Sequence, residues 1–144
     1  MVHYYLKVNF LNGQRHGKGK KFFLDGKLEY EGEYLYNKKY NWKGYDANGN
    51  IIYELINGNG KVKEYDEDGK LLFDGEYLNG KRNGKGKEYY DDGDLLFEGK
   101  YLNGQRNGKG KEYDSYDGKL IFEGNYLNGE KNGKGKEYYR DRYS

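Results

Sequence analysis

The chain has 144 residues, of which 35% are charged and 18% are aromatic, and it contains no Cys and no Pro. Without Cys, a disulfide framework and a thiolate metal site are excluded. The formal net charge is only +2, from 26 basic and 24 acidic residues, so the composition predicts no general attraction to nucleic acid or to acidic lipid.

The aromatic content favours a folded chain, although the high charge and the mean hydropathy of -1.30 would by themselves suggest disorder. The sequence has 19 Tyr, 6 Phe and 1 Trp, and such rings suit a thin structure in which they are half covered. It shows neither a long apolar run that would span a membrane nor a recognisable secretory signal at its start. We therefore expect a cytoplasmic location.

A repeat runs through residues 1–144, which we interpret as a single domain. The units start near Leu6, Tyr30, Tyr53, Phe73, Phe97 and Phe122, at offsets of 24, 23, 20, 24 and 25 residues. Residues 36–65 are degenerate, because the Gly-x-Gly of the other units is missing or displaced there. The short unit that starts at Tyr53 is expected to have lost part of its first turn.

Each unit predicts two short strands, as the unit that starts at Phe97 shows. Phe97, Gly99 and Tyr101 alternate with other residues at a period of two, and a second strand is expected over 108–113. Residues 103–107 are polar and include Gly, so they are expected to form the turn between the strands.

Glycine has two expected roles in this pattern. Asp-Gly pairs such as Asp92-Gly93 predict tight turns between strands. Within the second strand, Tyr101 is expected to lie flat over Gly108 or Gly110, where the backbone has no side chain of its own.

A single hairpin buries too little surface to fold alone, so neighbouring units are expected to share ring packing and ladder hydrogen bonds. The sequence therefore predicts an all-β fold: an elongated, single-layer antiparallel β-hairpin repeat solenoid of about six repeats.

The units resemble the MORN (membrane occupation and recognition nexus) repeat, whose pattern is an aromatic residue, one residue, Gly, a second aromatic residue, and then Gly and Gly-x-Gly. The unit that starts at Phe97 matches this pattern with Gly99, Tyr101, Gly104, Gly108 and Gly110, and the units from Phe73 and Phe122 match in the same order. The resemblance implies a rigid solenoid with an aromatic-lined concave groove that serves protein–protein interaction and scaffolding. It also implies links to phosphoinositides and to dimerisation, and it adds the cytoskeleton or a membrane to the expected sites of association.

Residues for catalysis are scarce. The only His residues are His3 and His16, the only Ser residues are Ser115 and Ser144, and there is no Thr. Because a nucleophilic triad needs a nucleophile beside a base, we predict that the chain is not an enzyme and has no cofactor. His16 takes the place that Asn107 has in another unit, so it is expected to be a turn residue.

Two segments resemble ligand-binding loops but lack a residue that each kind of loop requires. Residues 66–69 look like a calcium loop, yet Gly75 stands where a bidentate Glu is needed. Residues 84–87 look like a phosphate loop, but no Ser or Thr follows a Lys and no helix is predicted. We therefore predict an ordinary turn at 66–69, no phosphate loop at 84–87, and no metal site.

A stripe of lysines is expected to stack along the sheet, formed by Lys85, Lys87, Lys109, Lys111, Lys134 and Lys136 and continued by Lys18, Lys20, Lys61 and Lys63. The stripe could follow an anionic surface, or it could keep a flat sheet soluble and block sheet-to-sheet pairing. Glu88, Glu112 and Glu137 are expected to lie near the stripe and to neutralise part of it.

A stripe of aromatic residues is the candidate site for a protein partner. Its rings are Tyr34, Trp42, Phe73, Tyr77, Phe97, Tyr101, Phe122 and Tyr126. Most of these rings are expected to form the core, since little else can fill it. A one-layer sheet would still leave some of them open for docking.

Three functions compete at this stage. The leading hypothesis is a scaffold that docks a peptide or a helix of a protein partner along the aromatic groove and self-associates end to end into a homodimer. The alternative is peripheral binding to anionic phospholipid, including phosphoinositide, through the lysine stripe. A carbohydrate- or choline-binding solenoid would be expected to carry a Trp in each repeat, whereas this chain has a single Trp. No nucleic-acid partner is expected.

Overall fold

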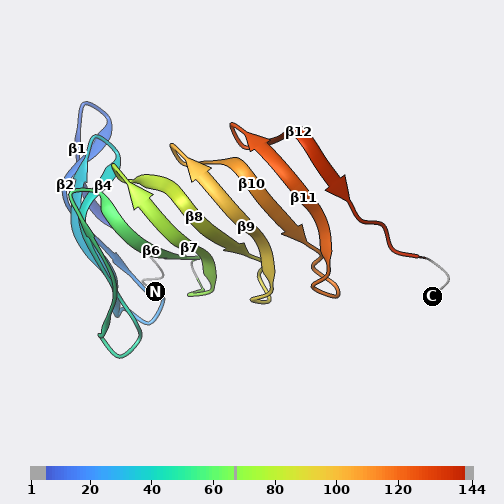
Figure 1. Ribbon diagram of the computed structural model, residues 1–144. Coiled ribbons are helices and arrows are strands. Elements are labelled where there is room, and N and C mark those ends of the chain that lie inside the picture. Colours follow the sequence, from blue (N-terminus) through green and yellow to red (C-terminus); the bar gives the residue numbers. More distant parts are fainter. Residues whose placement is uncertain (1–5, 67, 142–144) are drawn as a thin grey trace.

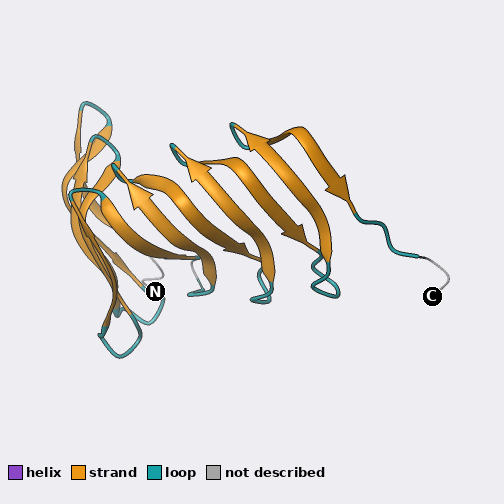
Figure 2. Ribbon diagram, in the orientation of Figure 1, coloured by secondary structure: helices purple, strands orange, loops and turns teal. Residues whose placement is uncertain are grey.

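We describe a computed structural model of the chain, which covers residues 6–66 and 68–141. Twelve strands form one antiparallel sheet in which every strand pairs with its neighbours in the sequence, and the described residues contain no helix (Figures 1 and 2). The strands are β1 (Leu6–Leu11), β2 (Gln14–Phe22), β3 (Leu28–Leu35), β4 (Lys38–Tyr45), β5 (Ile51–Ile56), β6 (Asn59–Tyr65), β7 (Leu71–Leu78), β8 (Lys81–Tyr89), β9 (Leu95–Leu102), β10 (Gln105–Tyr113), β11 (Leu120–Leu127) and β12 (Glu130–Glu137). The predicted all-β hairpin array of about six repeats is confirmed. No described segment is a helix long and apolar enough to cross a bilayer.

The turn within each regular unit is shorter than predicted. Asn103 and Gly104 both have positive φ angles, 51° and 88°, which is the signature of a two-residue type I′ turn. β10 therefore begins at Gln105, and the predicted turn over 103–107 is wrong beyond its first two residues. For the same reason, His16 lies within β2 and is not a turn residue.

The Asp-Gly turns join successive units through longer loops than predicted. Of the pair Asp92-Gly93, only the glycine has a positive φ angle, 93°. The amide of Tyr90 donates to the carbonyl of Asp94 (2.9 Å), and the amide of Gly93 donates back to Tyr90 (2.9 Å). This is a three-residue loop that closes on a left-handed glycine, which is a common hairpin connection.

The two glycines of each Gly-x-Gly have separate roles. Gly108 has a φ angle of 92° and lies in a β-bulge, because the pairing of β10 with β9 shifts between Arg106 and Gly110. A Cβ on Gly110 would lie 2.5 Å from the ring of Phe97 and 3.0 Å from the ring of Tyr126. The predicted cover by Tyr101 is wrong: Tyr101 lies over Gly86 of the preceding unit.

The short unit is shortened in its strands and keeps its turn. Asn57 and Gly58 have the positive φ angles of a type I′ turn, 54° and 78°. β5 and β6 are six and seven residues long, whereas β9 and β10 are eight and nine. The pairing of β5 with β6 also shows no register shift. The predicted loss from the first turn is therefore wrong, since the missing residues come from the strands beside it.

Candidate functional site

The sheet has two chemically different faces. Successive strand residues point to opposite faces, so Phe97 and Tyr101 lie on one face, and Glu98, Lys100 and Leu102 lie on the other. We call the first the ring face and the second the lysine face.

On the ring face, Phe73 and Phe97 are each enclosed by two rings and a guanidinium, and Phe122 by the Tyr126 ring and the Lys131 ammonium. The ring of Phe97 meets Tyr101 of its own unit at 5.8 Å and Tyr126 of the next unit at 5.3 Å, both edge to face. The guanidinium of Arg106 stacks 4.0 Å above the Phe97 ring. Edge-to-face pairs and stacked cations of this kind stabilise by about 0.5–2 kcal/mol each, so they tie adjacent units together.

A carboxylate from the preceding unit binds the tyrosine hydroxyl and the arginine or lysine that surround each phenylalanine, and we call these residues together a set. Glu88 accepts hydrogen bonds from the Tyr101 hydroxyl and from Arg106, whose Nε and Nη2 lie 3.0 and 2.9 Å away. Burial acts to raise the pKa of Glu88, but the hydrogen bonds from Arg106 and Tyr101 outweigh it and hold the pKa below its ordinary value. Corresponding sets join Glu64 to Tyr77 and Arg82, and Glu112 to Tyr126 and Lys131.

We call the repeated sets around Glu64, Glu88 and Glu112 the Tyr–Glu–Arg ladder. Their positions correct one prediction. Glu88 and Glu112 were expected beside the lysine stripe, where they would neutralise it. Strand alternation places them on the ring face instead, because both lie opposite Phe97 on the neighbouring strands, and both pair with Arg106. They therefore leave the charge of the lysine face unchanged.

The predicted docking rings are core residues. Seven of the eight candidates are buried, and Tyr77 is half-buried. Phe73 and Phe97 have no exposed surface. A ring that is fully covered offers no contact area to a partner, so the ring face is not the open aromatic groove that the sequence predicted.

The predicted lysine stripe lines a groove on the opposite face. The groove has a volume of about 1120 Å³ and runs across β6–β12, and all six candidate lysines from 85 to 136 line it. Its floor is formed by cross-strand glycine pairs: Gly75 with Gly86, Gly99 with Gly110, and Gly124 with Gly135. A Cβ on any of these glycines would point to the ring face, toward Phe73, Phe97 or Phe122, so the floor of the groove is backbone and its sides are the lysine and acidic side chains.

The groove is strongly positive. Eight Lys and four Asp or Glu residues line it, which gives a formal charge of 8 − 4 = +4, whereas the whole chain carries +2. Lys85 lies directly opposite Lys100 on the neighbouring strand. The positive charge of Lys87 is neutralised to a greater extent, because Lys87 lies opposite both Asp74 and Glu98. Unneutralised charge therefore concentrates in the row that contains Lys85 and Lys100.

A row of exposed apolar residues borders the groove. Leu78, Leu102 and Leu127 are each 48% exposed and each directly precede an Asn-Gly turn. Leu102 lies two residues beyond Lys100 and so points to the same face. We call these three residues the leucine row. Sequence reasoning missed it, although the recurrence of Leu at one place in the unit could have revealed it.

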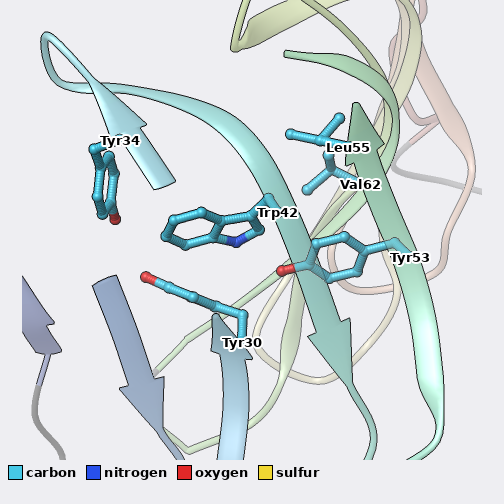
Figure 3. Packing of buried hydrophobic residues seen from close by; sticks show 6 residues of the cluster. All are labelled: Tyr30, Tyr34, Trp42, Tyr53, Leu55 and Val62. Carbon is cyan, nitrogen blue, oxygen red and sulfur yellow. The ribbon is translucent and has the colours of Figure 1, made fainter. Parts of the chain in front are cut away.

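The degenerate stretch forms a second core around Trp42 (Figure 3). Trp42 pairs across the sheet with Gly32, so it occupies the place of the second glycine of a Gly-x-Gly. Its ring packs 4.6 Å from Tyr30 and 4.8 Å from Tyr34. The missing glycine thus reflects a larger core ring at that place.

A partly buried lysine lies against this core. Lys39 Nζ stands 4.9 Å from the centre of the Tyr30 ring and 5.3 Å from that of Trp42. Burial lowers the pKa of Lys39 to about 8. Nearby, Glu29 is buried and pairs with Lys21 at 3.3 Å.

The residues that sequence reasoning set aside for catalysis or metal binding have structural surroundings. The amide of Tyr36 donates to His16 Nδ1 at 3.5 Å, and Ser115 lies in a turn. The carboxylate of Asp66 accepts from the amides of Asp68 and Lys70, as in an ordinary turn. Across residues 6–66 and 68–141, no three His, Asp or Glu side chains gather as metal ligands. His3, Glu67 and Ser144 lie outside the described residues.

Comparison with known families matches most of the chain. The family described as MORN repeat matches residues 73–95, 97–117 and 122–142. The family described as MORN repeat variant matches residues 15–36, 41–56 and 58–79. A search of curated proteins gave no significant match.

Proposed function

Because the chain belongs to the MORN repeat family, whose repeats typically bind proteins or membranes, we propose that it is a non-catalytic interaction module. It holds an acidic segment of a protein partner in the groove of the lysine face. The observation that carries this proposal is the concentration of a formal charge of +4 in one open groove of a chain whose net charge is +2.

The shape of the groove supports a long, narrow partner. The groove crosses several hairpins, from β6 to β12, so it can hold an extended peptide or a helix along its length. The hairpins repeat about every 9.6 Å, twice the strand spacing, and two turns of an α-helix rise by about 10.8 Å. A helix with acidic residues on one stripe and apolar residues on the next would therefore meet the lysines and the leucine row in each unit.

A charge-reversal variant tests this function. The variant K85E/K109E/K134E removes three lysines that line the groove. The matched control, K27E/K70E/K119E, makes the same change of charge in the turns between units. The probe is a labelled synthetic helix with Glu and Leu at heptad positions, and fluorescence anisotropy gives its affinity at low and high salt. We expect the groove variant to lose at least tenfold in affinity and the control to lose little. Equal losses would reject the groove as the site.

A second candidate function is peripheral binding to an anionic membrane. It is favoured by the leucine row, because apolar side chains beside lysines can enter a bilayer surface while the ammonium groups meet lipid headgroups. Flotation with phosphatidylcholine vesicles, with and without phosphatidylserine or a phosphoinositide, tests it. Replacing Leu78, Leu102 and Leu127 by Ser is expected to abolish flotation if the membrane is the partner. Flotation that survives this replacement would reject this route.

End-to-end self-association is the remaining part of the proposal. The outer edges of β1 and β12 have no strand partner among the described residues. Unpaired edges of this kind are templates for pairing with another chain.

A further inference from the structure

The contacts that join successive units form a repeated template. At the junction of β10 and β11, the ring of Tyr126 lies over Gly110, and Lys131 approaches Glu112 at 3.6 Å. The amide of Gly129 also donates to the carbonyl of Arg106 at 2.9 Å. The preceding junction has the same three contacts, with Tyr101 over Gly86, Arg106 on Glu88, and Gly104 bonded to Arg82.

Each junction joins a glycine and a glutamate of one unit to an aromatic ring and a cation of the next unit. β12 carries the glycine and the glutamate, and no following unit within the described residues pairs with it. All of its residues are exposed. A Cβ on Gly135 would meet Phe122 of its own unit, but no tyrosine from a following unit. Glu137 takes the place that Glu88 and Glu112 have in the preceding units, and it binds the hydroxyl of Tyr139 from the chain beyond the strand.

The hairpin of β1 and β2 carries the aromatic ring and the cation. Phe10 pairs with Arg15 as Tyr101 pairs with Arg106, so Phe10 occupies the tyrosine place of the unit. Phe10 is 64% exposed, because no strand within the described residues lies beside β1 to offer its ring a glycine. Arg15 occupies the place of Arg106, and the turn glycine, Gly13, occupies that of Gly104.

We propose that β12 of one copy pairs with β1 of a second copy, antiparallel, and so continues the sheet from chain to chain. Applying the register of β10 and β11 to this junction places Gly133 opposite Phe10 of the second copy and Gly135 opposite its Val8. Phe10 then covers Gly135, Arg15 reaches Glu137, and the amide of Gly13 donates to the carbonyl of Lys131. This proposal deepens the self-association named under the proposed function and does not depend on what the groove binds.

The same register also predicts the weak point of the junction. Lys136 would face Lys7 of the second copy, whereas the corresponding pair inside the chain is Lys111 with Glu123. Like charges directly opposite are destabilising. We therefore expect weak, concentration-dependent association, and we expect Lys7→Glu to strengthen it about fivefold or more.

Because the junction joins two different surfaces, it can be tested by complementation. The variant F10D removes the ring that β1 contributes to the junction, and E137K reverses the charge that β12 contributes. Both positions are exposed in the single chain. We expect each variant alone to be a monomer by light scattering, and an equimolar mixture to form a dimer and stop there. A mixture that stays monomeric while the wild type associates, or a single variant that still associates like the wild type, would overturn the proposal.

Cysteine cross-linking tests the register, since the chain has no Cys. Lys7→Cys and Lys136→Cys are carried by separate chains in the K7C/K136C mixture. Directly opposite residues of antiparallel strands have Cα atoms about 4.5–5.5 Å apart, which is within the range that a disulfide spans. Mass spectrometry under oxidising conditions is expected to show this heterodimer in at least fivefold excess over that from K7C and K134C. Equal yields would reject the register. A wild-type chain that stays monomeric at its highest soluble concentration would reject the junction, whereas the helix-binding assay would still report on the groove.

Discussion

The two glycines of each Gly-x-Gly meet different neighbours, and their substitution has different costs. Gly110 does not have a positive φ angle, so its cost comes from the rings of Phe97 and Tyr126 above it. We expect Gly110→Ala to destabilise by about 1–3 kcal/mol, as overpacking of a core does. In a Phe97→Leu background the added methyl has more room, so the same change is expected to cost less. Urea unfolding of the four chains of this cycle measures the coupling, and additive costs would contradict the ring contact.

The carboxylates of the Tyr–Glu–Arg ladder make stability depend on pH. The pKa of Glu88 lies below its ordinary value of 4.5 in the folded chain. Its stabilising contribution is therefore complete above about pH 4.5 and is lost as the pH falls through the folded pKa. Glu88→Gln is expected to lower the free energy of unfolding at pH 7 by about 1.5–3 kcal/mol and to flatten its decrease below pH 4.5. Urea midpoints across pH check this, with the exposed Glu130→Gln as control. Parallel curves for Glu88→Gln and wild type would contradict it.

At the residue scale, sequence reasoning found the lysines of the groove but misplaced the glutamates. The alternation of Lys109 and Lys111 with glycines is local, so their shared face could be read directly. The same alternation puts Glu88 on the opposite face, opposite Phe97, so its place next to Lys87 in the sequence does not bring it to the lysines of the groove. The rings were correctly expected to fill the core, but their complete cover depends on Arg106 and its counterparts, which come from the far strand of the hairpin.

At the scale of elements, the hairpin of β5 and β6 is the weak joint of the array. Its two strands pair through Glu54–Lys61, Leu55–Gly60 and Ile56–Asn59, whereas β9 and β10 pair through five such positions. Because this hairpin has fewer paired positions, fewer hydrogen bonds must break when it opens locally, and the free energy of local opening is lower. We expect the amides of β5 and β6 to exchange with solvent faster than those of β9 and β10. Hydrogen exchange followed by mass spectrometry measures this, and slower exchange in β5 and β6 would contradict it.

The elements themselves were largely predictable, because every strand pairs with its neighbours in sequence. A period of two between Gly-containing turns is sufficient to indicate hairpins of this kind. Lengths and bulges were not predictable in the same way. Gln105 and Arg106 read as turn residues by polarity, yet a type I′ turn needs only Asn103 and Gly104 and returns the next residue to the ladder.

At the scale of the whole molecule, two cores follow one another along the sheet, around Trp42 and around Phe97. In such a linear array, the stability is close to a sum of unit terms and nearest-neighbour interface terms. An added regular unit is therefore expected to increase both the free energy of unfolding and its denaturant dependence, because it adds one unit and one interface of buried surface.

Duplicating residues 97–121 directly after position 121 adds such a unit in the existing register. The inserted copy of Tyr101 would cover Gly110, and Tyr126 would cover the inserted copy of Gly110, so both new junctions keep their ring contacts. We expect a higher urea midpoint and a larger m-value than in the natural chain. A control insert in which the copies of Phe97 and Tyr101 are Ser has the same length but no ring packing, and its midpoint is expected to fall below that of the first insert. If both inserts unfolded at the same midpoint, the rings between units would not be what holds the array together.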